Sequence, residues 1–260
     1  MAATPESNPE QPAAQSERAA GTVLITGGAR RLGAAIALRL GAAGWDVIVH
    51  YRSSQEAAEE LVAVLRKMGR KAWALAADLS DPLACPRLIQ EAAKLSGGLN
   101  ALVCNASIFD ASTLMDLRAE DIQENVQLHA VAPLLLARAF SELPEARQIL
   151  NLLDSKISGP DEEHLAYHLS KRMLADLTRS MALTFAPRIA VNGLAPGAVL
   201  PADGKSLEQF AALAQEIPMR RTGTPEDISA AALFLLTSEF VTGQIMFVDG
   251  GRHLHGKLYG

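Results

Sequence analysis

Short apolar runs alternate with longer amphipathic segments along the chain from residue 22 onward. Apolar runs of about five residues are typical of strands that are buried on both faces of a sheet. The longer segments repeat their apolar residues every three or four positions, as helices do when one face packs against a core. Because strands that alternate with helices are typical of a parallel sheet, the pattern predicts an α/β fold.

Seven strands and six main helices follow from this pattern. We expect the strands at 22–26, 46–50, 72–76, 100–104, 148–153, 189–194 and 244–248. We expect the helices at 31–43, 55–68, 82–95, 120–142, 165–185 and 225–236. Asp81 is the expected cap of the third helix, and Pro133 should kink or break the fourth because proline has no N–H to donate. The elements predict a single domain with a doubly wound parallel sheet.

Two segments depart from the alternating pattern. Residues 1–20 are rich in Ala, Pro, Gln, Ser and Glu and lack an apolar run, so we expect a disordered tail ahead of a domain that spans 21–260. This tail has neither the order of a signal peptide nor the composition of a transit peptide. Between 198 and 221, Pro, Gly and charged residues surround a short amphipathic piece at 206–215, which predicts a mobile substrate loop.

Composition and charge narrow the class of partner. The formal net charge is −5, and 49% of the residues are hydrophobic. A chain without a basic patch is not expected to bind nucleic acid or an anionic membrane, and no apolar run has the length that spans a bilayer. Cys85 and Cys104 lack the spacing of a metal site or a redox pair. We therefore expect a cytoplasmic protein that has no metal and acts on a small molecule.

A glycine-rich turn, 26–33, joins the first predicted strand to the first predicted helix. Glycines at such a junction let backbone N–H groups approach a pyrophosphate, and the start of the helix adds partial positive charge. Gly27 and Gly33 are the glycines that fit this role. A glycine-rich turn can also be an ordinary tight loop, but its place at the start of a strand–helix series favours a dinucleotide site.

The charges near this turn favour a phosphorylated cofactor. An NAD site places an acid after the second strand, whereas an NADP site needs cations there. The second predicted strand ends in His50-Tyr51-Arg52-Ser53-Ser54, with no acid before Glu56, and Arg30 lies in the glycine turn. Two solvated surface arginines are the simpler interpretation, but a guanidinium offers a planar fork of donors that suits phosphate. We therefore predict NADP (NADPH) as the cofactor.

Tyr167 and Lys171 carry the expected chemistry. Residues four apart share one face of a helix, so the lysine is expected to lower the pKa of the phenol and make it a better proton donor. Asp154 precedes Tyr167 by thirteen residues, at the end of the fifth predicted strand. This arrangement indicates a reductase.

Four further motifs join these to give a family resemblance. They are Asp78-Leu79, Asn105-Ala106, Pro196-Gly197 and 248–251, each at the end of a predicted strand. Over about nine tenths of the chain, the set resembles the short-chain dehydrogenase/reductase family. The resemblance implies a Rossmann-like sheet of about seven strands, a nicotinamide cofactor and a homotetramer. Together with the residue patterns, it assigns cofactor binding to Gly27, Arg30, Arg31, Leu32, Gly33, His50, Tyr51, Arg52, Ser53, Asp78, Leu79, Asn105, Ala106, Ser107, Tyr167, Lys171, Pro196 and Gly197.

The departures from this family resemble its pteridine reductases. Those enzymes have arginine where most members have the glycine that corresponds to Arg31, and aspartate where most have the serine that corresponds to Asp154. They also carry Asn-Ala-Ser followed by an aromatic, as at 105–109. The C-terminal 249–254 and the histidine at 129 resemble the bacterial dihydromonapterin reductases, which also reduce dihydrofolate. The resemblance implies NADPH-dependent reduction of dihydromonapterin, dihydrobiopterin or dihydrofolate to the tetrahydro form.

This resemblance implies the following site. The expected catalytic residues are Asp154, Tyr167, Lys171 and His129, and the expected substrate contacts are Arg31, Ser107, Phe109, Asp154 and Tyr167. Phe109 would stack on a flat pterin, although a core aromatic is the simpler interpretation. A simpler interpretation of Asp154 is that it caps a turn. A simpler interpretation of His129 is that it is a core histidine whose hydrogen bonds are satisfied.

Two other functions stay open. One is reduction of a 3-oxoacyl thioester or another carbonyl, with Ser155 acting after a shift of one residue. The other is a non-catalytic NADP-binding sensor, because a fold does not determine a function.

Overall fold

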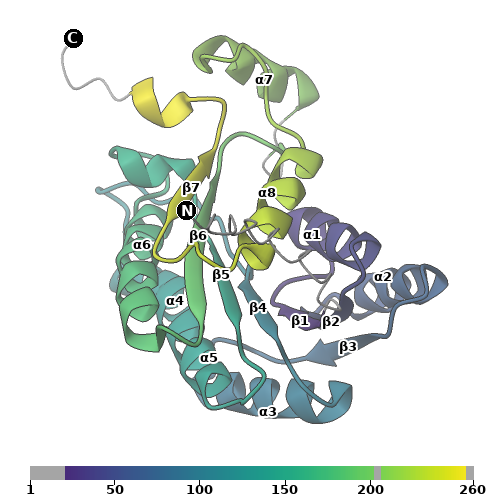
Figure 1. Ribbon diagram of the computed structural model, residues 1–260. Coiled ribbons are helices and arrows are strands. Elements are labelled where there is room, and N and C mark those ends of the chain that lie inside the picture. Colours follow the sequence, from purple (N-terminus) through teal and green to yellow (C-terminus); the bar gives the residue numbers. More distant parts are fainter. Residues whose placement is uncertain (1–20, 202–205, 256–260) are drawn as a thin grey trace, which may run out of the picture.

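Seven parallel strands form one sheet in the order β3-β2-β1-β4-β5-β6-β7. The computed structural model describes residues 21–201 and 206–255 (Figure 1). The strand order reverses between β1 and β4, which are neighbours in the sheet, so the prediction of a doubly wound Rossmann-like sheet is confirmed. The strands are β1 (Thr22–Ile25), β2 (Asp46–Tyr51), β3 (Ala72–Ala76), β4 (Ala101–Cys104), β5 (Gln148–Leu152), β6 (Ala190–Pro196) and β7 (Ile245–Val248).

Helices cover both faces of the sheet (Figure 1). The helices on one face are α1 (Arg31–Ala42), α2 (Gln55–Lys67) and α8 (Pro225–Thr237). Those on the other face are α3 (Ala84–Ser96), α4 (Ala119–Val126), α5 (Ala132–Ser141) and α6 (Leu165–Phe185). Two covered faces explain why the strands are mostly apolar instead of alternating regularly with polar residues.

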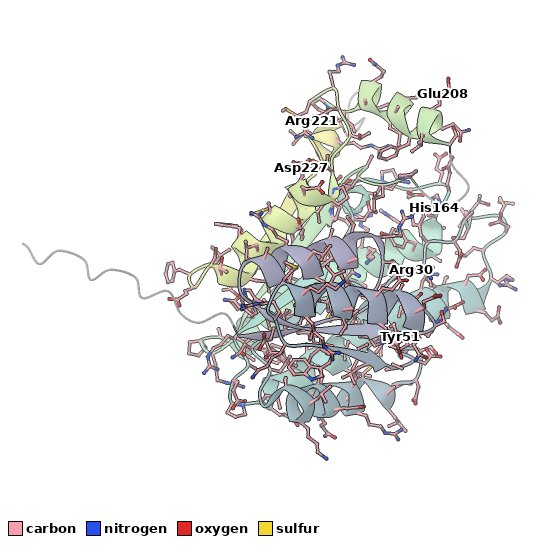
Figure 2. The ribbon with its side chains drawn as sticks, turned by 90° about the vertical axis from the view of Figure 1, so that its right-hand side faces the viewer. Arg30, Tyr51, His164, Glu208, Arg221 and Asp227 are labelled. Atoms are coloured by element: carbon pink, nitrogen blue, oxygen red, sulfur yellow. The ribbon has the colours of Figure 1, made fainter. Side chains whose placement is uncertain are left out.

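Parallel strands bring their carboxyl ends to the same edge of the sheet. In Figure 2 this edge carries Arg30, Tyr51 and His164, which come from three separate segments of the sequence. In an open α/β sheet, the crevice at this edge, where the strand order reverses, is the usual ligand site.

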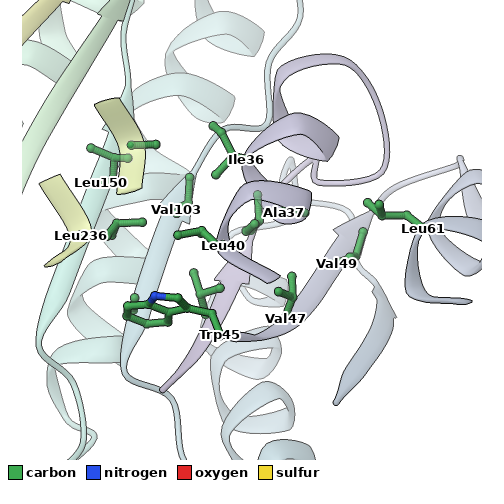
Figure 3. Packing of buried hydrophobic residues seen from close by; sticks show 14 of the residues in the cluster. Ile36, Ala37, Leu40, Trp45, Val47, Val49, Leu61, Val103, Leu150 and Leu236 are labelled. Carbon is green, nitrogen blue, oxygen red and sulfur yellow. The ribbon is translucent and has the colours of Figure 1, made fainter. Parts of the chain in front are cut away.

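Aliphatic side chains build the two cores. On the α1 face, Ile36 and Leu40 of α1 pack with Val47 of β2 and Leu236 of α8 (Figure 3). All of them except Leu236 are fully buried, and Leu236 is 3% exposed. Trp45 closes the end of this cluster farthest from the glycine turn (Figure 3). Burying such a side chain contributes about 2 kcal/mol, so these layers hold the sheet edge in place.

The predicted helix at 120–142 is interrupted, as Pro133 indicated. Helix α4 ends at Val126, a π-helical turn spans Gln127–Val131, and α5 begins at Ala132. The Ala132 N–H donates to the Gln127 carbonyl, five residues back. Pro133 has no N–H to donate to the carbonyl four residues earlier, so the helix widens to a π-helical hydrogen-bond pattern at this point. The widened turn carries His129, which is 1% exposed.

Some boundaries differ from the predictions. Helix α3 begins at Ala84, because Asp81 Oδ1 accepts the Leu83 N–H at 2.9 Å and caps a turn ahead of the helix. The piece expected at 206–215 forms α7 (Leu207–Ala212) and a 3-10 turn (Leu213–Glu216). The predicted tail at 1–20 and residues 202–205 of the predicted substrate loop lie outside the described residues. None of the helices within 21–201 and 206–255 combines the length and apolar character needed to cross a bilayer.

Candidate active site

The turn between β1 and α1 is too tightly packed to accept side chains at two positions. Gly27 has φ +58°, and a Cβ there would lie 2.9 Å from the Cα of Ala106. A Cβ at Gly33 would lie 2.5 Å from the Gly27 carbonyl oxygen. The turn therefore presents bare backbone at the N-terminus of α1, as the binding of a pyrophosphate requires.

Polar side chains from neighbouring strands hold this turn. The Oγ1 of Thr26 accepts the N–H groups of Asn105 at 2.9 Å and Ala106 at 3.1 Å. The Nδ2 of Asn105 donates to the carbonyls of Thr26 at 2.9 Å and Gly27 at 3.0 Å. Asn105 thus acts on the turn itself, and Thr26 is a supporting residue that sequence reasoning missed. The place of Thr26 at the last polar position of a buried strand is the signal that could have shown it.

His50 supports the same turn from β2. Its Nδ1 accepts the Gly27 N–H at 3.0 Å, so Nε2 carries the ring proton and donates to the Ala77 carbonyl at 3.1 Å. Burial lowers the pKa of His50 to about 4 and keeps the imidazole neutral. The ring thus holds the glycine turn, and the predicted contact of His50 with a cofactor stays a prediction.

Cationic side chains lie beside the turn. Arg30 and Arg52 are exposed, and Arg30 and Tyr51 lie at the same edge of the sheet (Figure 2). Two hydrogen bonds from Ser80 lower the pKa of the Asp78 carboxyl, and the charge of Arg52 lowers it further to a smaller extent. The other predicted cofactor residues lie in the glycine turn, next to it in α1 or at strand ends: Leu32, Ser53, Leu79, Ala106, Ser107, Pro196 and Gly197.

Arg31 adopts a backbone conformation that favours glycine. Its φ is +52°, in the left-handed region. Its Nη2 donates to the Pro201 carbonyl at 2.8 Å, so the guanidinium reaches from the glycine turn to the start of the predicted substrate loop. A side chain kept at a strained position indicates a functional use of that side chain.

The structure brings Asp154, Tyr167 and Lys171 together. The phenol of Tyr167 donates to Asp154 Oδ2 at 3.0 Å. The other carboxylate oxygen, Oδ1, accepts the Lys156 N–H at 2.8 Å, so Asp154 both caps a turn and faces the phenol. Lys171 Nζ donates to the Leu152 carbonyl at 2.7 Å and lies 5.6 Å from the centre of the Tyr167 ring.

Burial dominates the electrostatics of this cluster. It raises the pKa of Tyr167 well above the usual 10, and the Asp154 charge raises it further. Burial also lowers the pKa of Lys171 to about 8. The prediction that Lys171 lowers the pKa of Tyr167 is therefore wrong for this arrangement, because the carboxylate is hydrogen-bonded to the phenol and the ammonium is not. The phenol keeps its proton at neutral pH, as a proton donor must.

His129 joins two loops of the site. Its Nε2 accepts the Ile108 N–H at 3.2 Å, so Nδ1 carries the proton and donates to Ser170 Oγ at 2.8 Å. Ser107 Oγ also lies 3.0 Å from Nε2. Burial, and then the charge of Lys171, lower the pKa of His129 to about 2. A ring that is neutral and bonded on both nitrogens positions its neighbours instead of carrying protons.

Phe109 lies at the open side of the cluster. Its ring meets the Tyr167 ring edge-on, with centroids 4.8 Å apart, and the residue is 42% exposed. It is therefore not the core aromatic that was the simpler interpretation. Its other neighbour is the imidazole of His164, which sequence reasoning missed. A polar residue at the first turn of the Tyr167 helix is a weak signal that gave no reason to select it.

A family model described as enoyl-(acyl carrier protein) reductase matches residues 27–253, a range that contains Gly27, Gly33 and the Asp154, Tyr167 and Lys171 cluster. The chain belongs to the short-chain dehydrogenase/reductase family. As a member of that family it is an oxidoreductase. The tyrosine and lysine of the family correspond to Tyr167 and Lys171 in the site described above.

Similar members of the short-chain dehydrogenase/reductase family differ in substrate. The chain is 34% identical over 253 residues to 3beta-hydroxysteroid dehydrogenase 1 of Eggerthella lenta, covering 90% of this chain and 94% of the relative. It is 32% identical over 237 residues to dihydromonapterin reductase of Shigella boydii, covering 89% and 96%. The crystal structure of FolM alternative dihydrofolate reductase 1 from Brucella canis complexed with NADP superposes with a TM-score of 0.86 at 29% identity, covering 91% of this chain and 95% of that one.

Proposed function

We propose that this protein reduces a 7,8-dihydropterin to the tetrahydropterin with NADPH. One observation carries the proposal: the hydrogen bond from the Tyr167 phenol to Asp154 Oδ2 at 3.0 Å. Most members of this family have a serine hydroxyl at that position, which binds a substrate carbonyl. A carboxylate there suits a ring nitrogen that must receive a proton, because the acid and the phenol can share and transfer one.

The glycine turn and its neighbouring cations fit NADPH. The bare backbone at Gly27 and Gly33 and the N-terminus of α1 suit the pyrophosphate. Arg30 and Arg52 are exposed, and the chain has no acid between the end of β2 and Glu56, where an NAD site would place one. The NADP complexes of the Brucella canis protein and of a short-chain dehydrogenase from Burkholderia cenocepacia support the same cofactor. When bound, NADPH supplies a hydride.

The described residues fit a flat, polar substrate. Phe109 offers a half-exposed apolar ring beside Tyr167. Arg31 and Ser107 lie at the same sheet edge and offer hydrogen bonds to the rim of a heterocycle. C6 of the ring accepts the hydride and N5 accepts a proton, so the product gains two hydrogens. The O–H bond of Tyr167 breaks as its proton passes to N5, Asp154 orients the phenol, and the buried Lys171 stabilises the phenolate that is left.

The shift of one residue that would put Ser155 in the role of Asp154 has no support in the geometry. Ser155 is buried at 4% exposure, whereas Asp154 faces the phenol. Carbonyl reduction is nevertheless the chemistry to test against, because the chain is also similar to a hydroxysteroid dehydrogenase.

Purified protein with NADPH tests the proposal against dihydromonapterin, dihydrobiopterin, dihydrofolate and an acetoacetyl thioester, with the loss of NADPH absorbance as the readout. We expect turnover of at least one pterin. Asp154→Asn should lower kcat for that pterin by about 100-fold or more, while NADPH affinity changes little. Turnover of the thioester alone would make the protein a carbonyl reductase, and tight NADPH binding with no turnover would make it a sensor.

The assembly and location complete the proposal. The homotetramer that the family resemblance implies stays a prediction, and so does a cytoplasmic location. Sedimentation of the purified protein measures the first of these directly.

A further inference from the structure

The imidazole of His164 lies flat against the ring of Phe109. The two centroids are 4.0 Å apart and the planes differ by 12°. The edge-on contact with Tyr167 fixes the same phenylalanine from another direction, at an angle of 86°. Phe109 thus has aromatic neighbours in two directions, and the residue is still 42% exposed, which leaves part of its ring open to a flat ligand.

A backbone bridge joins the two loops that carry these rings. The Ser112 N–H donates to the Glu163 carbonyl at 2.8 Å, and the Leu165 N–H donates to the Ser112 carbonyl at 2.8 Å. The Oγ of Ser112 accepts the Ala166 N–H at 3.1 Å. Because Ser112 is buried, the loop after β4 and the start of α6 form one unit.

The His164 side chain is not needed to build this unit. His164 lies at the N-terminal cap of α6, but its side chain makes no capping hydrogen bond. Its Nδ1 is buried, has no hydrogen-bond partner among the described residues, and lies 3.7 Å from Asp161 Oδ1. Asp161 instead accepts the backbone N–H groups of Glu163 at 2.9 Å and His164 at 2.7 Å. The contact that defines the position of the imidazole is therefore the stack on Phe109.

We propose that His164 is a positioning residue of the substrate pocket, whose neutral ring supports Phe109 from behind and sets the plane on which a flat heterocyclic substrate stacks. This inference rests on the proposed function and names a residue that sets substrate affinity. A ring that is already held in its binding orientation loses little freedom when the substrate arrives. Aromatic pairs of this geometry are worth enough to change KM by about three- to tenfold.

The stack also makes substrate affinity depend on pH. Burial, and then the Lys156 charge, lower the pKa of His164 from its ordinary 6.5. Because the covered ring resists protonation, protonation favours arrangements in which Phe109 no longer covers it. Affinity should therefore be full at neutral pH and fall on the acid side of 6.5, as the pH passes through the lowered pKa of His164. The charged groups that face His164 come from the end of β5, a 3-10 turn at Ser155–Ser158 and the loop before α6: Asp154, Lys156, Asp161 and Glu163.

Steady-state kinetics of three variants test this role. His164→Ala should raise KM for the preferred dihydropterin about three- to tenfold at pH 7.5, with kcat within about twofold and NADPH affinity unchanged. His164→Phe restores the stack without a titratable group, so it should recover the wild-type KM and remove the rise of KM at pH 5.5. His253→Ala is the matched control, because His253 makes a similar stack on a different ring, that of Phe247, with centroids 4.2 Å apart.

The outcomes separate the two proposals. A wild-type KM in His164→Ala, or an equal rise of KM in His253→Ala, overturns the role of His164 and leaves pterin reduction intact. Failure of His164→Phe to recover KM, in a variant whose melting temperature matches the wild type, also overturns it. A wild-type protein that binds NADPH but turns over no pterin overturns the proposed function, and this inference with it.

Discussion

The Nδ1 of His129 donates to the Oγ of Ser170 across 2.8 Å, and through this bond the π-helical turn before α5 meets the face of α6 that carries Tyr167. The Ser170 hydroxyl donates in turn to the Tyr167 carbonyl at 2.7 Å. On the other side of the ring, Nε2 accepts the Ile108 N–H next to Phe109. The neutral imidazole of His129 therefore sets the position of Tyr167, the expected proton donor, relative to Phe109.

Replacing His129 should change stability and leave the pH profile in place. His129→Ala leaves the Ile108 N–H and the Ser170 hydroxyl without their partner, so the free energy of unfolding should fall by about 2 kcal/mol. Because the pKa of His129 is about 2, no limb of the kcat profile between pH 5 and 9 belongs to it. Urea denaturation and a pH–rate series measure both. A limb that is present in the wild type and missing in the variant would show that His129 titrates.

Lys171→Met should stabilise the protein and abolish its activity. Burial lowers the pKa of Lys171 from 10.5 to about 8, so between these pH values the unfolded chain binds more protons than the folded one. The free energy of unfolding of the wild type should therefore rise with pH across this window, and the variant should lack the rise. At pH 7 the full penalty of the buried charge is present, and its removal should gain on the order of 2 kcal/mol after loss of the Leu152 hydrogen bond.

Melting temperatures at pH 7 and 10 check this prediction. The difference between variant and wild type should be largest at pH 7 and small at pH 10. Lys156→Met is the control, because that lysine is partly exposed and its pairing with Asp161 should make the same replacement destabilising. Equal pH dependence in the wild type and Lys171→Met would contradict a lowered pKa.

The fold could be predicted because its strands are covered on both faces. An unbroken apolar run such as that of β4, whose four residues are all buried, is unambiguous between two polar turns. The break near Pro133 was also visible, since the missing N–H has a local effect. Boundaries were less certain. Asp81 could cap either a turn or the helix itself, and only the backbone of Leu83 decides which.

The proximity of Asp154, Tyr167 and Lys171 could be predicted from the sequence, but their energetics could not. The spacing of Tyr167 and Lys171 places them on one helix face, but it says nothing of which charge touches the phenol. Hydrogen bonding to Asp154, which raises the pKa of Tyr167, depends on how β5 ends against α6. The stack of His164 on Phe109 joins loops 55 residues apart, and one sequence contains no pattern for such a contact.

Arg52 should decide between NADPH and NADH. Its guanidinium is exposed at the end of β2, and a charge-assisted hydrogen bond to a phosphate is worth about 1.5–3 kcal/mol. Arg52→Ala should therefore weaken NADPH binding about 10- to 100-fold and leave NADH binding nearly unchanged. Quenching of protein fluorescence by each cofactor measures both affinities. Lys67→Ala, at the distant end of α2, is the control, and equal loss for both cofactors in Arg52→Ala would contradict recognition of the extra phosphate.

Arg31→Gly should separate stability from activity. The φ of +52° costs a non-glycine residue about 1 kcal/mol, so glycine should raise the free energy of unfolding by a similar amount, less the lost bond to Pro201. The same change removes a guanidinium from the sheet edge and should raise KM for the dihydropterin about tenfold or more. Arg220→Gly is the comparison for stability alone, because Arg220 has a similar φ of +53° and should gain a similar amount when glycine replaces it. If Arg31→Gly stabilises the protein and leaves KM unchanged, the strained arginine has no part in substrate binding.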